Sequence, residues 1–182
     1  MKEKEIVKFW IEEVIIGLNL CPFARVPYEK GLLNLNVCIF LEEEKRTHYF
    51  FDVLERVVMH PEDDFNAVVA FPRVLDDFHD FYDWVSFLDD LIKRQKLPID
   101  VQLITFHPDF TFDQSQEAIH PRAHLVNSSP YPAIHLLKAK AISNVLVDPK
   151  DGEKISRMNE EKLKALSLNE LKAKFFWKKD LF

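Results

Sequence analysis

Three strand-like segments alternate with helical segments through the first 106 residues, and this alternation constrains the fold more than any other feature. Residues 31–41 alternate apolar and polar side chains with the period of two typical of a strand. Residues 66–71 and 99–106 are short apolar runs that end at Pro72 and His107. Strands separated by helices need crossover connections and favour parallel pairing. We therefore predict an α/β fold, a single layered domain with a small, largely parallel sheet of about three main strands covered by helices.

Amphipathic spacing predicts the helices that cover this sheet. The predicted helical segments are residues 3–18, 45–59, 78–92, 132–143 and about 159–178. Residues 1–182 are expected to form one domain, on which residues 147–182 pack as a C-terminal helical extension. The aromatic end of that extension, Phe175 to Trp177, is expected to pack on its own core or on a partner subunit, so a homo-oligomer through this helix is one alternative.

Composition excludes several classes of protein. The formal net charge of −6 at pH 7, without a concentrated Lys/Arg face, argues against nucleic-acid binding. With three glycines the chain has no GxGxxG or GxxxxGK[ST] motif for a nucleotide. The start MKEKEIVKFW lacks the apolar core of a leader, and no apolar run approaches the roughly 18–20 residues of a membrane span. We expect a cytoplasmic protein whose partner is a small-molecule ligand.

A long segment without periodicity, from His107 to Ser129, follows the third strand. A loop of this length in a compact domain is usually functional or mobile. Open α/β sheets bind ligands at the carboxyl ends of their strands, where His107 and Arg73 should lie. We therefore predict the functional site here. The loop also carries Asp109, Asp113, His120, Arg122, His124 and Asn127 to Ser129.

The stretch NSSPYPAIHLL, residues 127–137, contains the most specific candidates. Ser129 is interpreted as the N-cap of a helix, with Pro130 or Pro132 in its first turn. The free N–H groups of that turn, with the side chains of residues 127–129, are a candidate seat for an anion, to which Arg73 or Arg122 would add charge. His135 would be kept neutral by the helix dipole, as a general base or metal ligand requires. The alternative is that residues 127–129 only cap a helix and that His135 packs in the core.

Three separated motifs resemble those of a known family. The stretches WIEEVIIGLNLCPFA, TFHPDF and NSSPYPAIHLL, between Trp10 and about Leu146, are similar to a bacterial family catalogued as a domain of unknown function, number 1415. Ser128 stands where that family usually has arginine, which weakens the proposed anion seat. The resemblance implies no known activity. The matching residues are Cys21, Pro22, Phe23, His107, Pro108, Asn127, Ser129, Pro130, Pro132 and His135.

Cys21 allows two interpretations. The sequence Cys-Pro-Phe is similar to the redox turn of glutaredoxin-like proteins, in which the cysteine opens a helix and has a lowered pKa. Here Cys21 follows a predicted helix, whose negative end would raise the thiol pKa, so a reactive thiolate needs a histidine brought to it by the fold. Cys21 is therefore either a structural core residue or a candidate nucleophile. Two cysteines, Cys21 and Cys38, are too few for a disulfide framework.

A metal site is the second chemical option. His120 and His124 have an H-x₃-H spacing, which alone is a weak signal, and His107, His135, Asp109 and Asp113 are the candidates to complete a metal site with them. The Asp run from Asp76 to Asp90 is interpreted as capping plus a solvated helix face.

Three functional hypotheses follow. The first is an enzyme acting on a small polar or anionic metabolite in a pocket lined by His107, Asn127, Ser129 and His135, with one histidine as acid or base and Cys21 as candidate nucleophile. The second is a non-catalytic binding or structural protein in which these residues brace the loop, and the third is a histidine-ligated metalloenzyme. The shared site requires that His107, His135 and Asn127 line one pocket within about 10 Å of each other, with Cys21 on its wall.

Overall fold

The structure is a computed structural model that describes residues 2–112, 120–148 and 150–178. Four strands form one sheet in the order β1-β2-β4-β3. The strands are β1 (Leu33–Val37), β2 (Asn66–Ala70), β3 (Val101–Phe106) and β4 (Ala133–Lys138). The α/β fold is confirmed. The sheet, however, has four strands, and only β1 and β2 pair in parallel, because β4 is antiparallel to both β2 and β3. The prediction of a largely parallel sheet of about three strands is therefore wrong.

Strand β4 and helix α5 (Ala139–Val145) occupy the segment predicted as a single helix. All six residues of β4 are buried, because the strand lies inside the sheet and is covered on both faces. A strand buried on both faces is a continuous apolar run, which periodicity cannot distinguish from a buried helix. Pro132 immediately precedes the strand, and its carbonyl accepts a hydrogen bond from the N–H of Phe71 at 2.8 Å.

The insertion of β4 leaves β1, β2 and β3 running in one direction. Their carboxyl ends, at Val37, Ala70 and Phe106, therefore lie at one edge of the sheet, together with the start of β4 at Ala133. The loops that leave this edge are those in which we expected the functional site.

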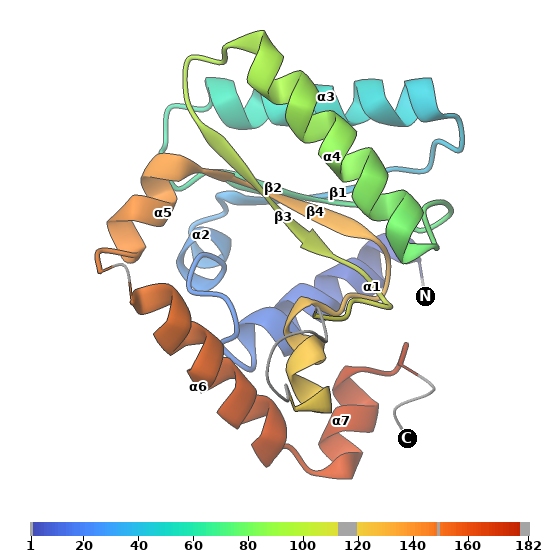
Figure 1. The fold of residues 1–182 in the computed structure, drawn as a ribbon, viewed down its shortest axis with the longest axis vertical. Helices are drawn as coiled ribbons and strands as arrows, with labels where there is room; N and C mark the ends of the chain where they lie inside the picture. The colour runs from blue at the N-terminus through green and yellow to red at the C-terminus, as the bar shows by residue number, and fades with distance from the viewer. Residues whose placement is uncertain (1, 113–119, 149, 179–182) are drawn as a thin grey trace.

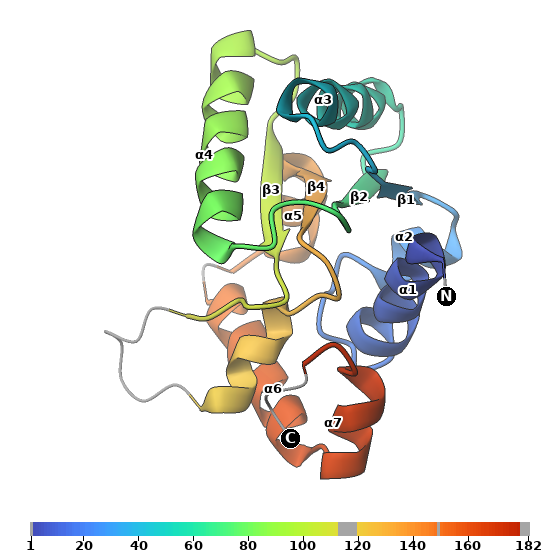
Figure 2. The ribbon, with the colours of Figure 1, turned by 90° about the vertical axis from the view of Figure 1, so that its right-hand side faces the viewer.

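Helices cover both faces of the sheet (Figures 1 and 2). One face carries α3 and α4, and the other carries the N-terminal helices together with α6 and α7. Within the described residues, no helix has the length and apolar character needed to cross a membrane. The helices are α1 (Glu3–Phe9), the π-helix η1 (Trp10–Ile16), α2 (Arg25–Glu29), α3 (Glu43–Met59), α4 (Phe78–Gln95), the 3₁₀ helix η2 (Pro121–Asn127), α5, α6 (Asp151–Ala165) and α7 (Leu168–Lys174).

Helix α4 is the element that agrees best with its sequence pattern. The side chain of Asp77 accepts hydrogen bonds from the N–H groups of His79 and Asp80, which caps the helix and lowers the pKa of this carboxyl. Lys96 ends the helix in the left-handed conformation. The apolar face of α4 packs with that of α3 in one core, around Phe50, Phe81 and Leu88.

The C-terminal helices complete the core on the opposite face. Leu163 of α6, Leu171 of α7 and Phe175 are buried there beside the N-terminal helices. The predicted helix from about residue 159 to residue 178 is two helices, because Ser167 caps a new one with the reciprocal bonds of a capping box. Of the aromatic end, Phe175 is fully buried in this chain's own core. A homo-oligomer through this helix stays a prediction.

Candidate functional site

His107 follows β3 and is fully buried. Its Nε2 atom lies 3.0 Å from the carbonyl oxygen of Leu75, and its Nδ1 atom accepts the N–H of Asp109 at 3.0 Å. This pattern requires the neutral tautomer with hydrogen on Nε2. Its ring packs against Phe78 and Phe81 of α4, and burial lowers its pKa. Both ring nitrogens of His107 are therefore engaged in hydrogen bonds with backbone groups.

His135 lies in the middle of β4 and not at a helix start, so the dipole argument for its neutrality is wrong. The ring is neutral for another reason: complete burial lowers its pKa to about 4. Its Nε2 atom lies 2.9 Å from Oδ1 of Asn66, the first residue of β2.

His107 and His135 lie on opposite faces of the sheet. Phe106 pairs with Ala133 and packs with it in the core formed by α1, η1, α6 and α7. His135 is two residues after Ala133 and shares its face, whereas His107 is one residue after Phe106 and turns to α4. The predicted pocket that unites the two histidines is therefore wrong, because side chains alternate along strands with a period of two.

The polar residues of NSSPYPAIHLL form hydrogen bonds with other groups of the protein. Ser128 is buried, and its carbonyl accepts the indole N–H of Trp10 at 3.1 Å while its Oγ accepts that of Trp177 at 3.0 Å. The Oγ of Ser129 donates to the carbonyl of Tyr131 at 2.6 Å. The interpretation of Ser129 as a helix N-cap is wrong, since a strand follows it. The backbone carbonyl of Asn127 accepts the N–H of His107 at 3.1 Å.

The two candidate arginines are separated by the fold. Arg73 is exposed and forms an ion pair with Glu3 at 3.3 Å. Arg122 lies on η2, where its Nη1 atom donates to the carbonyls of Lys164 and Leu166 at the end of α6, each at 2.9 Å. Arg122 thus fills the role of a C-terminal helix cap.

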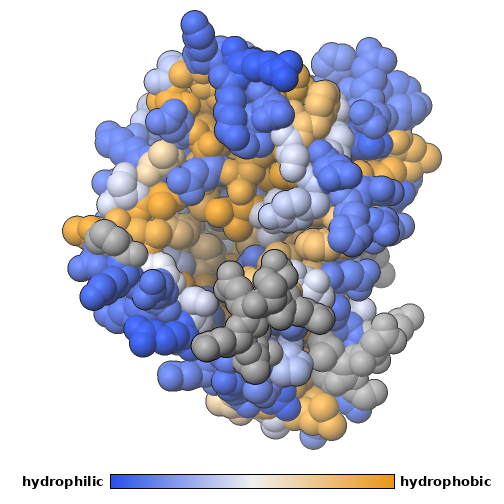
Figure 3. Space-filling view, in the orientation of Figure 1, coloured by the Kyte–Doolittle hydropathy of each residue, from blue (hydrophilic) through white to orange (hydrophobic). Residues whose placement is uncertain are grey.

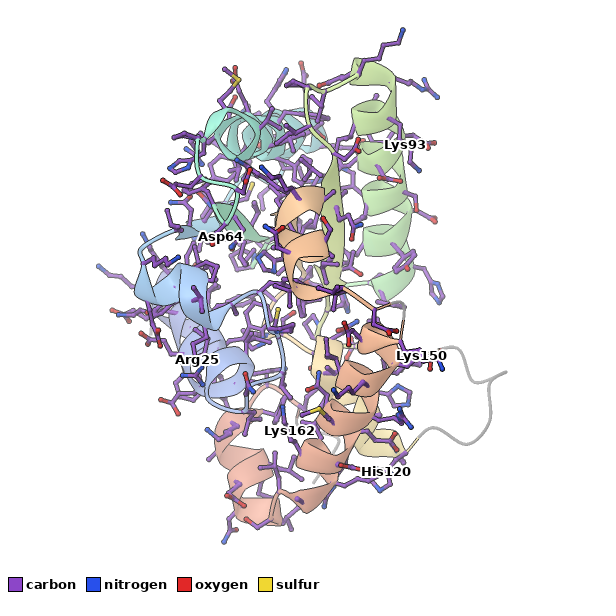
Figure 4. All side chains as sticks on the ribbon, turned by 90° about the vertical axis from the view of Figure 1, so that its left-hand side faces the viewer. Arg25, Asp64, Lys93, His120, Lys150 and Lys162 are labelled. Atoms are coloured by element: carbon purple, nitrogen blue, oxygen red, sulfur yellow. The ribbon has the colours of Figure 1, made fainter. Side chains whose placement is uncertain are left out.

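The metal candidates are likewise held in backbone contacts. The Nδ1 atom of His120 accepts the N–H of Arg122, and that of His124 accepts the N–H of Phe112. His120 lies beside α6 in Figure 4. Asp113 lies outside the described residues. Within residues 2–112, 120–148 and 150–178, no three His, Cys, Asp or Glu side chains are grouped so that they could hold a metal ion.

Cys21 is a free, partly buried cysteine, packed against the core that contains Trp10 and Val68. Burial raises its pKa to about 11, opposed by a hydrogen bond to the backbone of Phe23. The thiol is therefore protonated at neutral pH, as expected for a structural cysteine.

A small apolar cavity of about 160 Å³ lies beside the Cys-Pro-Phe turn. Asp64 lines this cavity and lies between α2 and α5 in Figure 4. Asn66, the partner of His135, also lines it. The motif that ends in Cys-Pro-Phe and the motif NSSPYPAIHLL therefore meet on one side of the sheet. They meet by packing around this cavity and do not form a shared polar site.

A larger cavity of about 500 Å³ lies at the carboxyl edge of β1 and β2, between α3 and α4. We call it the strand-end cavity. Hydrophilic side chains gather on the surface over the N-terminal half of α4 (Figure 3). The cavity is lined by Glu43, Arg46, Val74, Leu75, Asp76, Asp80, Asp83, Trp84 and Phe87.

Two residues of the lining carry a buried N–H group that has no acceptor in the part of the chain that the structure describes. Arg46 is 9% exposed and Trp84 is 6% exposed. The Nη1 atom of Arg46 donates to the carbonyl of Leu41 at 2.9 Å, its Nη2 atom donates to Glu43 at 3.3 Å, and its guanidinium lies 5.3 Å from the Trp84 ring centre. Nε of Arg46 and Nε1 of Trp84 have no hydrogen-bond partner among the described residues. Buried donors are nearly always paired, so these two suggest an acceptor that the described residues do not supply.

Leu75 connects the strand-end cavity to His107. Its φ of 65° lies in the left-handed region, which is uncommon for a residue with a Cβ. The bond from His107 holds the Leu75 carbonyl in this conformation. His107, a candidate site residue from the sequence, therefore contacts the strand-end cavity only indirectly, through Leu75.

Sequence reasoning missed Arg46 and Trp84, although a signal for both existed. Arg46 precedes Phe50 by four residues and Val53 by seven, which places a charge on the apolar stripe of α3. Trp84 follows Phe81 by three residues on the apolar stripe of α4. A charge on a buried stripe must find partners in the fold or a ligand.

Comparison with known proteins places the chain in a family. A family model described as "Protein of unknown function (DUF1415)" matches residues 2–173. No curated protein and no solved structure matches the chain. Because the family model covers most of the sequence, the chain belongs to this family of proteins of unknown function.

Proposed function

We propose that the protein binds a small polar metabolite in the strand-end cavity, that His107 braces the cavity wall through Leu75, and that the other loop histidines and serines have structural roles elsewhere in the fold. The observation that carries the proposal is the pair of unpaired buried donors, Arg46 Nε and Trp84 Nε1. A buried donor without an acceptor costs about 1–3 kcal/mol. An acceptor group on a ligand would recover that free energy, so the unliganded site favours binding.

The position and size of the cavity support the same proposal. Open α/β sheets bind ligands at the carboxyl ends of their strands, and this cavity is lined by the loop that follows β2, by the start of α3, which follows β1, and by α4. A volume of about 500 Å³ lies within the usual range of small-molecule sites, roughly 300–1,000 Å³. The hypothesis of a histidine-based enzyme receives less support, because His107 uses both ring nitrogens on backbone groups and His135 is 3% exposed.

The cytoplasm is the compartment that we propose for this activity. Both cysteines are free, and Cys38 is buried. Free thiols are the norm in reducing compartments.

The indole N–H of Trp84 gives a direct test by NMR. Of the three tryptophans, Trp10 and Trp177 donate to Ser128, whereas the Trp84 indole has no acceptor among residues 2–112, 120–148 and 150–178. The protein is titrated with the common amino acids, with succinate and citrate, and with glycerol, and the W84F variant assigns the Trp84 signal. We expect at least one compound to shift the Trp84 signal saturably while the Trp10 and Trp177 signals stay in place. If none of these probes moves the Trp84 signal at millimolar concentration, the proposal fails.

A further inference from the structure

We infer that the strand-end cavity selects an amino-acid-like zwitterion, whose carboxylate meets Arg46 and Trp84 and whose ammonium meets the aspartates of α4. This inference rests on the proposed function, because it names the chemical class of ligand for the same site. Three features of the lining carry it: the buried donors, the carboxylate rim and the apolar wall.

The donor end of the cavity suits a carboxylate. Arg46 and Trp84 both line the cavity and Arg46 carries a full positive charge, while the buried Nε–H of Arg46 and Nε1–H of Trp84 have no partner among the described residues. A guanidinium bonded to a carboxylate is among the strongest pairings in proteins. Glu43 occupies only the Nη2 side of Arg46, at 3.3 Å, and leaves Nε without a partner.

The rim of the cavity suits a cation. Asp76, Asp80 and Asp83 are exposed and line the cavity, and none of them forms an ion pair with a described residue. Asp80 and Asp83 are three residues apart on α4, so their side chains share one side of the helix. In the described part of the chain these carboxylates are not grouped closely enough to hold a metal ion. An ammonium group needs no such coordination geometry, since it is a point charge with several donors.

The charges of the lining argue against a ligand with a single charge. The carboxylates of Glu43, Asp76, Asp80 and Asp83 outnumber the one guanidinium, so a simple anion that reaches Arg46 is repelled by the rim. A simple cation is attracted to the rim but leaves the Arg46 and Trp84 donors unpaired. A zwitterion satisfies both ends, and its charges give orientation as well as affinity.

The remaining wall is apolar and suits a hydrocarbon side chain. Val74, Leu75 and Phe87 line the cavity, and Phe87 is 47% exposed. The Trp84 ring is not a free stacking platform, because Arg46 lies over it and Phe71 packs at 5.0 Å from its centre. A sugar, which usually needs an open aromatic face, is therefore disfavoured relative to an aliphatic amino acid.

Four probes of similar size test the inference. Norvaline carries adjacent ammonium and carboxylate groups, pentanoate lacks the ammonium, butylamine lacks the carboxylate, and 5-aminopentanoate separates the two charges. Each is titrated into the intact protein at low salt, with the Trp84 indole signal and calorimetry as readouts. We expect one of the two zwitterions to bind at least tenfold more tightly than pentanoate and butylamine.

Variants separate the two ends of the site. D80N and D83N each remove a rim charge, and we expect each to weaken zwitterion binding several-fold while pentanoate binding improves. D90N is the matched control, because Asp90 is an exposed carboxylate on α4 that lies outside the cavity lining. W84F removes the indole donor, and we expect it to weaken pentanoate and zwitterion alike, read by calorimetry.

The outcomes distinguish this inference from the proposed function. If pentanoate or butylamine binds as tightly as both zwitterions, the protein binds a small ligand but the zwitterion class is wrong. If D90N weakens binding as much as D80N, the rim has no specific role and the inference also fails. If no probe and none of the metabolites in the broader titration moves the Trp84 signal, the proposed function itself is overturned.

Discussion

The Nε2 atom of His107 lies 3.0 Å from the carbonyl oxygen of Leu75, and this hydrogen bond joins the loop after β3 to the wall of the strand-end cavity. The two residues are 32 positions apart in sequence. His107, which the sequence presented as a candidate catalytic residue, therefore contacts the wall of the cavity without lining the cavity itself. It holds a left-handed Leu75 in place, and Leu75 in turn shapes the cavity.

Replacement of His107 by alanine should destabilise the fold. The H107A variant leaves the Leu75 carbonyl and the Asp109 N–H without partners and opens a gap beside Phe78 and Phe81. We expect a loss of about 2–4 kcal/mol in the free energy of unfolding, measured by urea denaturation. H48A is the control: His48 is exposed on α3, so its replacement should change stability by less than about 0.5 kcal/mol. A loss in H107A as small as that in H48A would contradict the bracing role.

Two tryptophans provide a matched comparison of a paired and an unpaired indole. Trp10 packs at 5.0 Å from the Phe106 ring and donates to Ser128, whereas Trp84 packs at 5.0 Å from the Phe71 ring and finds no acceptor in the described part of the chain. W10F and W84F both lose ring volume, but only W10F leaves a buried carbonyl unpaired. We expect W10F to be the less stable variant by about 1–3 kcal/mol in chemical denaturation. Equal destabilisation would mean that Trp84 also forms a stabilising hydrogen bond.

The stability of the protein should fall between pH 7 and pH 5 because of His135. Burial holds the pKa of His135 at about 4 in the folded state, below its ordinary value of 6.5. As the pH falls, the unfolded chain takes up the proton first, so the contribution of neutral His135 is present above pH 6.5 and is lost toward pH 4. Linkage gives a loss of about 2 kcal/mol between pH 7 and pH 5.

The H135Q variant isolates this contribution. Glutamine keeps a donor for Asn66 but does not titrate, so its stability should fall by about 2 kcal/mol less than that of the wild type over the same pH range, in urea unfolding curves. His107 also has a pKa lowered by burial, and part of the pH dependence should therefore remain in H135Q. Parallel pH profiles for H135Q and the wild type would show that His135 titrates normally.

Two backbone positions should respond in opposite directions. Lys96, exposed at the end of α4, has a φ of 48°, and Gly31 has a φ of 70° with no atom within 4 Å of the place that a Cβ would take. K96G should stabilise the fold by about 0.5–1 kcal/mol, because glycine adopts this conformation without steric cost, and G31A should destabilise it by a similar amount. Thermal unfolding measures both variants. A lower Tm for K96G would show that the Lys96 side chain contributes more than the backbone.

The sequence pattern was sufficient to predict the helices and strands that have one solvent-exposed face. The apolar stripe of α4 was predicted correctly because one side of the helix faces solvent. The capping role expected within the run from Asp76 to Asp90 is confirmed at Asp77, because capping depends on residues close together in sequence. Strand β1 also follows its sequence pattern in part: Leu33, Leu35 and Val37 pack in one core and Asn34 is exposed, but Asn36 is buried and hydrogen-bonded to Val68 and Arg56.

Only the tertiary structure decided the strand identity of β4 and the separation of the candidate residues. The segment from Ala133 to Lys138 is buried on all sides, so its periodicity is lost, and pairing with β2 and β3 made it a strand. This one change placed His135 on the face opposite His107, because a strand turns successive side chains to alternate faces. The strand-end cavity also arises only in the fold: Arg46 and Trp84 lie on different helices, and they line one cavity only because α3 and α4 pack together.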